Sequence, residues 1–484
     1  MSTSAKLSAR DRVFTLLDDN SFVEIGALVT KRSTDFNLQA KEAPSDGVIT
    51  GYGLINGSPV YVYSQDVTAL SGSIGEMHAK KIVNLYDLAL KTGAPVVGLI
   101  DCAGLRLEEA TDALAGLGDI YYRQSLASGV IPQIAAVFGK CGGGLAVSAS
   151  MCDFVFVEKE NGKVFINTPD AVEGNNEGKC DTSSACFKAE AGVVDFVCDD
   201  EVGMLNAVRD LVSVLPSCNE DDAPQAECED DLNRLVPEFE SDLDDISAGI
   251  RDISDGGLFI ETKADFAKQM VTGFIKLDGN TVGVVANREA VKDEAGKVTE
   301  KFAPVLTAAC CRKAEKFISF CDAFDIPVLS IVNVTGYGNC MRNEKNIAPM
   351  AAKLTFTYAN ATTPKVTLIT KKALGSAYVS MGSKNLGADL VFALEGAEVG
   401  MMEDKLAAQI VYADELKDAA DHAKALEEKA ALYAEQKLKA SSAANRGYID
   451  NVIDPAETRK NLIYAFEMLY LKSDERPVKK HGTV

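Results

Sequence analysis

The sequence predicts an α/β protein made of two similar domains. Two observations predict this: short, continuous apolar segments alternate with helix-like segments, and the same order of segments occurs twice along the 484 residues. Strands that are apolar throughout are typical of parallel sheets whose faces are both covered by helices. A chain of this length is also large enough to bury one core in each of two domains.

The first repeated segment has the pattern of a β-hairpin. Residues 49–65 read ITGYGLINGSPVYVYSQ, and residues 271–287 read VTGFIKLDGNTVGVVAN. In each, an Asn-Gly or Asp-Gly dipeptide separates two apolar stretches, which is the strongest short-range signal for a two-residue hairpin turn. A helix-like stretch follows, from His78 in the first copy and from Arg312 in the second.

Two buried strands that begin at proline come next in each copy, and their spacing identifies a duplication. Four residue pairs match at one offset of 232 positions: Pro95 with Pro327, Gly104 with Gly336, Pro132 with Pro364, and Gly143 with Gly375. Four matches at a single offset, spread over two elements, indicate an internal duplication.

An acidic segment sets the expected domain boundaries. Residues 219–245 contain twelve Asp or Glu and one basic residue, Arg234, and so carry half of the net charge of −22. Such a charge run is more typical of a solvated linker than of a functional patch. We therefore expect an N-terminal domain at 1–230, a linker at 231–245 and a C-terminal domain at 246–484.

The last part of the chain is expected to add helices to the second domain. Residues 403–440 are rich in Ala, Leu, Lys and Glu and lack Gly and Pro, which predicts a long helical segment. An amphipathic pattern from Thr458 predicts a final helix. Helices of this kind more often serve packing or oligomerisation than catalysis.

Composition disfavours several classes of protein. The negative charge would repel a nucleic acid backbone. No hydrophobic signal core or membrane-length apolar run occurs, so we expect a cytoplasmic protein. The twelve cysteines include no C-x-x-C pair, and the doublet Cys310-Cys311 has the wrong spacing for zinc, so we expect reduced thiols and no metal in this subunit.

The common catalytic motifs are also absent from the sequence. Only three histidines occur, and His78 lies in a helical pattern without the G-x-S-x-G segment of a serine hydrolase. Neither a phosphate-binding P-loop motif nor a dinucleotide-binding G-x-G-x-x-G fingerprint after a first strand is found. Nucleotide hydrolysis and dinucleotide-dependent redox chemistry are therefore disfavoured.

Small residues after a buried strand in each half are the main candidates for catalysis. They are Gly142, Gly143 and Gly144 after IAAVFGK, and Gly375, Ser376 and Ala377 after VTLITKKAL. Each run is expected to lead into a helix, whose first backbone N–H groups can stabilise an oxyanion such as a thioester enolate. Close packing of helix on strand explains such glycines equally well on composition alone.

Longer segments resemble the biotin-dependent acyl-CoA carboxyltransferases. They are DGVITGYGLINGSPVYVYSQD with SGSIGEMHAKKI in the first half, and AEKFISFCDAFDIPVLSIVNVTGY, TTPKVTLITKKALGSAYVSMGSKNLGADLVFALEGAEVGMM and RGYIDNVIDPAETR in the second. The resemblance extends from Lys6 to about Leu471. This family includes the β subunits of propionyl-CoA and acetyl-CoA carboxylases and the α subunits of methylmalonyl-CoA and glutaconyl-CoA decarboxylases.

The resemblance implies two crotonase/ClpP-like domains, the N-terminal one on the acyl-CoA side and the C-terminal one on the biotin side. It implies an oxyanion hole in each. Backbone N–H groups of Gly143 and Gly144 would hold the enolate oxygen, and those of Ser376 and Ala377 the ureido oxygen of biotin, with Gly375 as a further catalytic candidate. No side-chain base is implied, since the biotin anion left by loss of CO2 can take the α-proton.

The family motifs also indicate which residues would border the substrate. They are Ser71, Gly72, Gly104, Arg106, Gly336 and Val379. Arg106 is the expected partner of the anionic CoA, with Lys80 and Lys81 as further candidates, although a solvated helix face is the more ordinary role of those lysines. Val379 is expected either to line a narrow, dry acyl pocket or to pack in a helix core.

Three segments depart from the family pattern, which leaves the acyl substrate open. The usual D-S-G-G-A-R is DCAGLR at 101–106, A-Y-G-G-A-Y is ALGSAY at 373–378, and D-V-P-G-F is NVTGY at 333–337. Ser376 keeps its backbone donor but adds a hydroxyl and a Cβ. We expect a methylmalonyl- or propionyl-CoA-like ester, with glutaconyl-CoA as an alternative.

The resemblance requires partners, because the chain has no A-M-K-M-like biotinylation site. Biotin would be attached to a separate carrier, with either a biotin carboxylase subunit or a membrane sodium-pumping decarboxylase subunit completing the complex. We favour the decarboxylase. A homo-oligomer from dimer to hexamer is expected, either free in the cytoplasm or peripheral to a membrane complex.

Two other classes of function remain open at this point. A crotonase-like hydratase or isomerase would need paired carboxylates at the thioester, for which Glu108 and Glu109 are candidates, although acidic residues at a helix start usually lie on the surface. Such an enzyme needs one active half, so the second glycine run disfavours it. A non-catalytic scaffold is suggested by the departures near Gly104 and Gly336.

Overall fold

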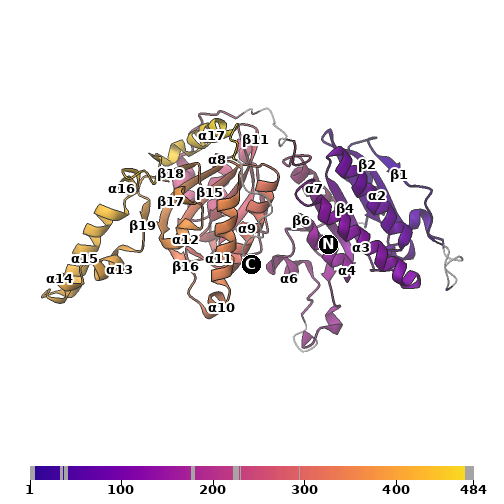
Figure 1. The fold of residues 1–484 in the computed structure, drawn as a ribbon, viewed down its shortest axis with the longest axis horizontal. Coiled ribbons are helices and arrows are strands. Elements are labelled where there is room, and N and C mark those ends of the chain that lie inside the picture. Colours follow the sequence, from indigo (N-terminus) through magenta and orange to yellow (C-terminus); the bar gives the residue numbers. More distant parts are fainter. Residues whose placement is uncertain are drawn as a thin grey trace. The chain divides into compact units, whose positions relative to one another are not determined.

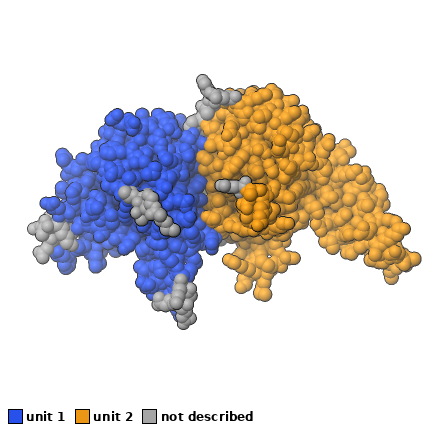
Figure 2. All heavy atoms as spheres, turned by 180° about the vertical axis from the view of Figure 1, so that it is seen from behind, with its two compact units in different colours: residues 1–224 blue, residues 225–484 orange. Residues whose placement is uncertain are grey.

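The computed structural model describes residues 6–32, 36, 42–175, 180–221, 228, 230–293 and 295–474. The chain divides into two compact units, residues 1–224 (unit 1) and residues 225–484 (unit 2) (Figures 1 and 2). Each unit contains an eight-stranded, mainly parallel sheet with helices packed on it. The predicted α/β class with two similar halves is therefore confirmed.

Unit 1 has its strands in the order β1-β2-β3-β4-β5-β6-β8, with β7 beside β5. The strands are β1 (Val23–Ile25), β2 (Val48–Ile55), β3 (Ser58–Gln65), β4 (Val96–Cys102), β5 (Gln133–Gly142), β6 (Phe154–Glu158), β7 (Lys163–Phe165) and β8 (Phe196–Cys198). The helices are α1 (Ala9–Leu16), α2 (Glu76–Thr92), α3 (Ala110–Ala127), α4 (Gly144–Met151), α6 (Ala185–Glu190) and α7 (Glu201–Val212).

Unit 2 repeats this order as β9-β10-β11-β15-β17-β18-β20, with β19 beside β17. These strands are β9 (Phe259–Thr262), β10 (Met270–Leu277), β11 (Asn280–Asn287), β15 (Val328–Val334), β17 (Lys365–Leu374), β18 (Leu390–Leu394), β19 (Glu398–Gly400) and β20 (Asn451–Ile453). Smaller strands outside the sheet are β12 (Ala290–Lys292), β13 (Val298–Lys301), β14 (Val305–Leu306) and β16 (Gly336–Tyr337). The shared strand order confirms the internal duplication.

The helices of unit 2 fall into a group that packs on the sheet and a group beyond it (Figure 1). The first group is α8 (Ile246–Ile253), α9 (Ala308–Ala323), α11 (Ile347–Asn360), α12 (Gly375–Val379) and α17 (Thr458–Leu469), and the short α10 (Met341–Glu344) contacts α11. The second group is α13 (Asp404–Val411), α14 (Ala413–Lys417) and α15 (His422–Tyr433), after which α16 (Ala440–Ala444) contacts β19 and β20 of the sheet. The predicted final helix from Thr458 is confirmed as α17.

The hairpin predicted in each half is present, as β2–β3 and as β10–β11. Asn56 and Gly57 both have positive φ, 47° and 81°, and Asp278 and Gly279 have 51° and 72°. Two consecutive left-handed residues make the type I′ turn that matches the twist of the flanking strands. The Asn-Gly and Asp-Gly dipeptides therefore set the register of both hairpins.

The predicted long helix at 403–440 is instead a set of shorter helices, and α13 packs against α15. The break has a local cause, since the side chain of Asp421 accepts a hydrogen bond from the backbone N–H of Lys424 and so caps a new helix. Asp is a strong helix N-cap, so an acidic residue can restart a helix where neither Gly nor Pro interrupts it.

Residues 231–245, which we expected to form a solvated linker, contribute to the core of unit 2. Val236, Phe239 and Leu243 are buried among residues of that core. The acidic positions hide this pattern in the sequence, because Glu238 and Glu240 flank Phe239 and are themselves exposed. The aromatic ring packs against Gly249 of α8, where an added Cβ would lie 3.1 Å from it.

We predict that Phe239→Ala lowers the stability of unit 2 by about 3 to 5 kcal/mol, because it leaves a cavity among fully buried neighbours. Chemical denaturation followed by circular dichroism would measure this loss. Glu240→Ala, next to it in sequence but exposed, is the matched control and should change stability little. Equal stability of the two variants would show that this segment is a linker.

Candidate functional site

The carboxyl ends of β4 and β5 bring two glycine segments together in unit 1. Cys102 of β4 is the register partner of Cys141 of β5, after a shift in the ladder that follows Ile100. Gly104 lies two residues beyond Cys102, and Gly143 lies two residues beyond Cys141. Parallel strands end at the same edge of the sheet, so the two glycines emerge beside one another.

Unit 2 has the same arrangement at the same sequence offset. Val334 of β15 is the register partner of Ala373 of β17, again after a shift in the ladder. Gly336 and Gly375 follow two residues later. The residue pairs found from the repeat in sequence therefore occupy equivalent places in the two sheets.

The glycine turn of unit 1, residues 142–144, joins β5 to α4 as predicted. Gly143 has φ 59° and ψ −131°, which favours glycine. Its N–H donates to the carbonyl of Phe165 at 2.8 Å. Gly144 is the first residue of α4, so its N–H has no acceptor within the helix, and it donates to nothing else in the described part of the chain. The available donor at this turn is therefore Gly144.

In unit 2 the equivalent turn joins β17 to α12. Gly375 has φ 63°, and Ser376 is exposed at the start of the helix. The hydroxyl of Tyr337 donates to the Ser376 carbonyl at 3.2 Å and contacts the Ser380 hydroxyl at 3.1 Å. This tyrosine, which sequence reasoning missed, fastens the segment after Gly336 to the first turn of α12.

Val379 and Ala377 lie on opposite sides of α12. The Val379 side chain is 41% exposed, whereas Ala377 is buried at 1%. A valine packed in a helix core would be buried. The exposed side chain of Val379 is therefore available to contact a ligand.

Ser71 and Gly72 lie beside the segment that contains Gly104. The Ser71 carbonyl accepts the N–H of Ala103 at 3.1 Å. The N–H of Ile74 donates to the Gly104 carbonyl at 3.0 Å. A Cβ on Gly72 would collide with the carbonyl oxygen of Asp101. Glycine is thus required at 72 for the two segments to meet.

Arg106 does not face solvent, contrary to its expected role with CoA. Its guanidinium is buried and donates at 2.7 Å to both Asp46 and Glu109. Glu109, expected on the surface, is likewise buried and also accepts the N–H of Glu76. Gly75 has no Cβ to collide with this cluster. The cluster therefore links the segment around Gly72 to the segment around Gly104.

His78 belongs to the same buried cluster. Its ring lies 3.0 Å from the Asp46 carbonyl and 3.2 Å from the Gln65 amide. Burial lowers the pKa of His78 to about 3, so the ring is neutral. Lys81, a CoA candidate, is also buried and donates to the Val48 carbonyl. Both side chains are buried and have backbone carbonyls among their polar partners, which fits a structural role for both.

Lys80 is exposed and forms an ion pair with Glu76 one helical turn away, at 2.7 Å. Lys80 therefore lies on a solvated helix face, which is the ordinary role that we considered for it besides CoA binding.

Asp46, by contrast, was not expected in the site. It is fully buried and accepts from both Arg106 and the His78 backbone. Its position after a proline, in PSDG, gave only the signal of a turn.

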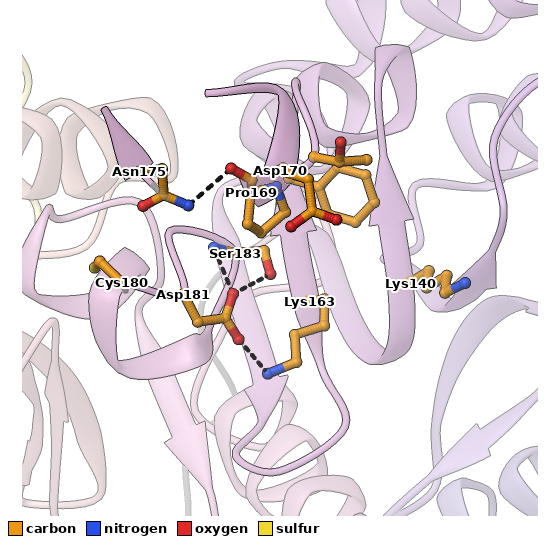
Figure 3. Close-up of a pocket in the computed structure, with 10 residues that line it drawn as sticks. Lys140, Lys163, Pro169, Asp170, Asn175, Cys180, Asp181 and Ser183 are labelled. Carbon is orange, nitrogen blue, oxygen red and sulfur yellow. Dashed lines mark hydrogen bonds and ion pairs between the residues drawn. The ribbon is translucent and has the colours of Figure 1, made fainter. Parts of the chain in front are cut away.

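A cavity of about 600 Å³ opens in unit 1 (Figure 3), and the carbonyl of Phe165, one of its lining residues, accepts the N–H of Gly143. It is lined by Lys140, Lys163, Phe165, Thr168, Pro169, Asp170, Asn175, Cys180, Asp181 and Ser183.

In the described part of the chain no group of three or more His, Cys, Asp or Glu is arranged to hold a metal ion. Of the described helices, none is long and apolar enough to cross a membrane.

Comparison with known proteins identifies relatives along nearly the whole chain. Residues 2–484 match the family model described as "Carboxyl transferase domain". The chain is 39% identical to the methylmalonyl-CoA decarboxylase subunit alpha of Propionigenium modestum, covering 99% of this chain and 93% of the relative. It is 40% identical to the propionyl-CoA carboxylase beta chain of Roseobacter denitrificans, covering 99% and 94%.

A solved structure is similar in fold as well. The transcarboxylase 12S crystal structure, a hexamer assembly with methylmalonyl-coenzyme A and methylmalonic acid bound, has a TM-score of 0.91 and 34% identity. The match covers 99% of this chain and 92% of that one.

We predict that Arg106→Ala destabilises unit 1 by about 3 to 5 kcal/mol, because two buried carboxylates lose their shared partner. Urea denaturation would measure the loss. The control is Arg32→Ala, which breaks only the exposed ion pairs of Arg32 with Glu76 and Asp112, and should be far milder. If Arg106→Ala kept full stability and weakened only ligand binding, the buried cluster would have no structural role.

Proposed function

The chain belongs to the carboxyl transferase domain family, and we propose that it transfers a carboxyl group between a methylmalonyl- or propionyl-CoA-like ester and biotin on a separate carrier. The observation that most directly supports this reaction is the glycine turn repeated at the same register in two sheets. A transfer between two carbonyl-type acceptors needs two oxyanion sites, whereas hydration or isomerisation needs one. We propose this acyl group because the names of the relatives contain methylmalonyl-CoA and propionyl-CoA and the similar solved structure has methylmalonyl-coenzyme A bound.

Unit 1 is proposed as the acyl-CoA side. The Gly144 N–H, at the start of α4, would donate to the thioester oxygen as it becomes an enolate oxygen. A helix N-terminus favours that negative charge, and a single backbone donor of this kind contributes about 3 to 4 kcal/mol to the transition state. Gly143 supports this role by its backbone conformation, since its own N–H is bonded to Phe165.

Unit 2 is proposed as the biotin side. The N–H groups of Ser376 and Ala377, at the start of α12, would donate to the ureido oxygen, with Gly375 setting the turn. The space around this turn fits such a group: a Cβ at Gly336 would meet nothing within 4 Å, and Ser376 is exposed. Biotin, when bound, supplies the carboxyl carrier and, after CO2 leaves, the base for the α-proton.

The buried state of the alternative acid-base groups supports a reaction without a side-chain base. His78 is neutral and enclosed, and Glu109 is held by Arg106. A hydratase or isomerase would need a carboxylate free to approach the thioester, which Glu109 is not. Glu108, the other candidate carboxylate, is only half-buried, so the structure disfavours Glu109 for this role and leaves the hydratase alternative to Glu108.

The proposed reaction needs biotin, and the sequence contains no A-M-K-M-like biotinylation site. We therefore propose that biotin is attached to a separate carrier. The complex would be completed by a biotin carboxylase subunit or by a membrane sodium-pumping decarboxylase subunit, and we favour the decarboxylase. A homo-oligomer is proposed from the hexamer of transcarboxylase 12S.

We predict that the protein, incubated with free biotin and methylmalonyl-CoA, releases CO2, and that Gly143→Ala lowers this rate about 100-fold. The alanine Cβ would meet nothing within 4 Å, so its effect is on the backbone: a left-handed φ strains an L-residue and the turn relaxes, which moves the Gly144 donor. Gly57→Ala, with φ 81° and equally open space, is the matched control and should retain the rate. Absence of biotin-dependent decarboxylation in the parent protein would contradict the proposed reaction.

We further predict that Val379, which the family resemblance places near the acyl chain, limits the size of the acyl group that the enzyme accepts. One methylene in an apolar pocket is worth roughly 1 to 3 kcal/mol, so discrimination should be partial. Val379→Ala should therefore change the ratio of kcat/KM values among methylmalonyl-CoA, malonyl-CoA and glutaconyl-CoA. An unchanged ratio in the variant would show that Val379 does not contact the acyl chain.

A further inference from the structure

The two glycine turns differ in the charge that stands beside them. Lys140 and Lys372 are equivalent residues, at the same offset of 232, on the central strands β5 and β17. Lys140 is the register partner of Lys163 on β7. Lys372 is the register partner of Glu398 on β19. Unit 1 therefore has two like charges where unit 2 has opposite charges.

Like charges on directly paired strand residues repel each other. Each of the two lysines is therefore expected to have a counter-charge nearby. Lys163 is neutralised by Asp181, whose carboxylate lies 2.9 Å away (Figure 3). The pKa of Asp181 is held below its usual range by the Ser183 hydroxyl and by Lys163, so the carboxylate is charged. Lys372 in unit 2 forms its own ion pair with Glu403 at 3.2 Å.

Lys140 is the member of this set without a counter-charge. It is exposed, and it forms no ion pair with any residue that the structure describes. It lines the cavity of about 600 Å³, a volume typical of a small-molecule site. The glycine turn of unit 1 thus has an unmatched cation two residues before it, which the turn of unit 2 lacks.

Phe165, which follows Lys163 on β7, connects the cavity to the glycine turn. Its carbonyl accepts the N–H of Gly143 at 2.8 Å. Its ring would lie 2.8 Å from a Cβ on Gly142. The same residue lines the cavity. A ligand whose thioester contacts Gly144 can therefore place its other parts in this cavity.

We propose that Lys140 forms an anion-binding subsite in unit 1, which holds a carboxylate or phosphate oxygen of the bound acyl-CoA. The inference rests on the proposed function and adds a specificity residue to it. A lysine ammonium suits either anion, since it acts as a compact point charge. The lining also contains Asp170 and the ion pair of Lys163 with Asp181, so its charges balance and an anion would be held by direct contact with the Lys140 ammonium.

The experiment measures dissociation constants of the full chain for four esters by calorimetry. Propionyl-CoA and methylmalonyl-CoA contain phosphates, whereas the matching propionyl- and methylmalonyl-pantetheine do not. Lys140→Gln should weaken binding of methylmalonyl-CoA about tenfold, as loss of one partly screened charge contact would. Lys140→Arg should stay within about threefold of the parent protein.

The control is Lys159→Gln, which removes an exposed unit 1 lysine that pairs with Asp199 and should bind like the parent. A loss in Lys140→Gln seen with both CoA esters and absent with both pantetheines supports the proposal, with phosphate as the anion. A loss confined to the two methylmalonyl esters supports it with the carboxylate.

Equal constants for Lys140→Gln and Lys159→Gln with all four esters would overturn the subsite while leaving the proposed reaction intact. A parent protein that binds no acyl-CoA at all would instead overturn the proposed function. Circular dichroism of each variant confirms that the fold is retained.

Discussion

The register between neighbouring parallel strands is the constraint on which the candidate site depends. Cys102 pairs with Cys141, and Val334 with Ala373, each after a shift in the ladder. Because side chains and chain ends follow the register, a slip of one residue would exchange the side chains between the two packed faces of the sheet and separate the glycine segments. All four strands are almost entirely buried, so hydrophobic burial on both faces fixes that register.

Burial alone would not fix the loops that follow the strands in unit 1. There the guanidinium of Arg106 is shared between Asp46 and Glu109, which come from different segments. Breaking such a buried pair leaves an uncompensated charge, so the cluster strongly disfavours any separation of those segments. The small residues around it have a steric purpose: Gly72 and Gly75 let backbone and charged groups approach where a Cβ would collide. A rigid scaffold of this kind suits catalysis by backbone donors, which cannot adjust as side chains do.

Duplication and divergence together suggest a division of labour within one chain. The two sheets share their strand order, their hairpin turns and the positions of their glycines. What differs is local: Lys163 against Glu398 beside the turn, and the helices from α13 to α16, which have no counterpart among the described helices of unit 1. Substitutions at surface positions cost little stability, so such differences can accumulate while the shared core remains.

The sequence by itself determined the fold class, the duplication, the hairpin turns and the glycine runs that lead into helices. Each of these depends on local patterns, such as Asn56-Gly57, or on spacing, such as Gly104 with Gly336, that a chain keeps before it folds. Tertiary structure decided the rest. Arg106 and Glu109 looked like surface charges because their partner, Asp46, is distant in sequence. Phe239 looked like part of a linker because acidic neighbours mask a single buried ring. Which amide is free at the turn, Gly144 rather than Gly143, depends on a hydrogen bond to Phe165 on another strand, and such long-range partners have no signature in local sequence.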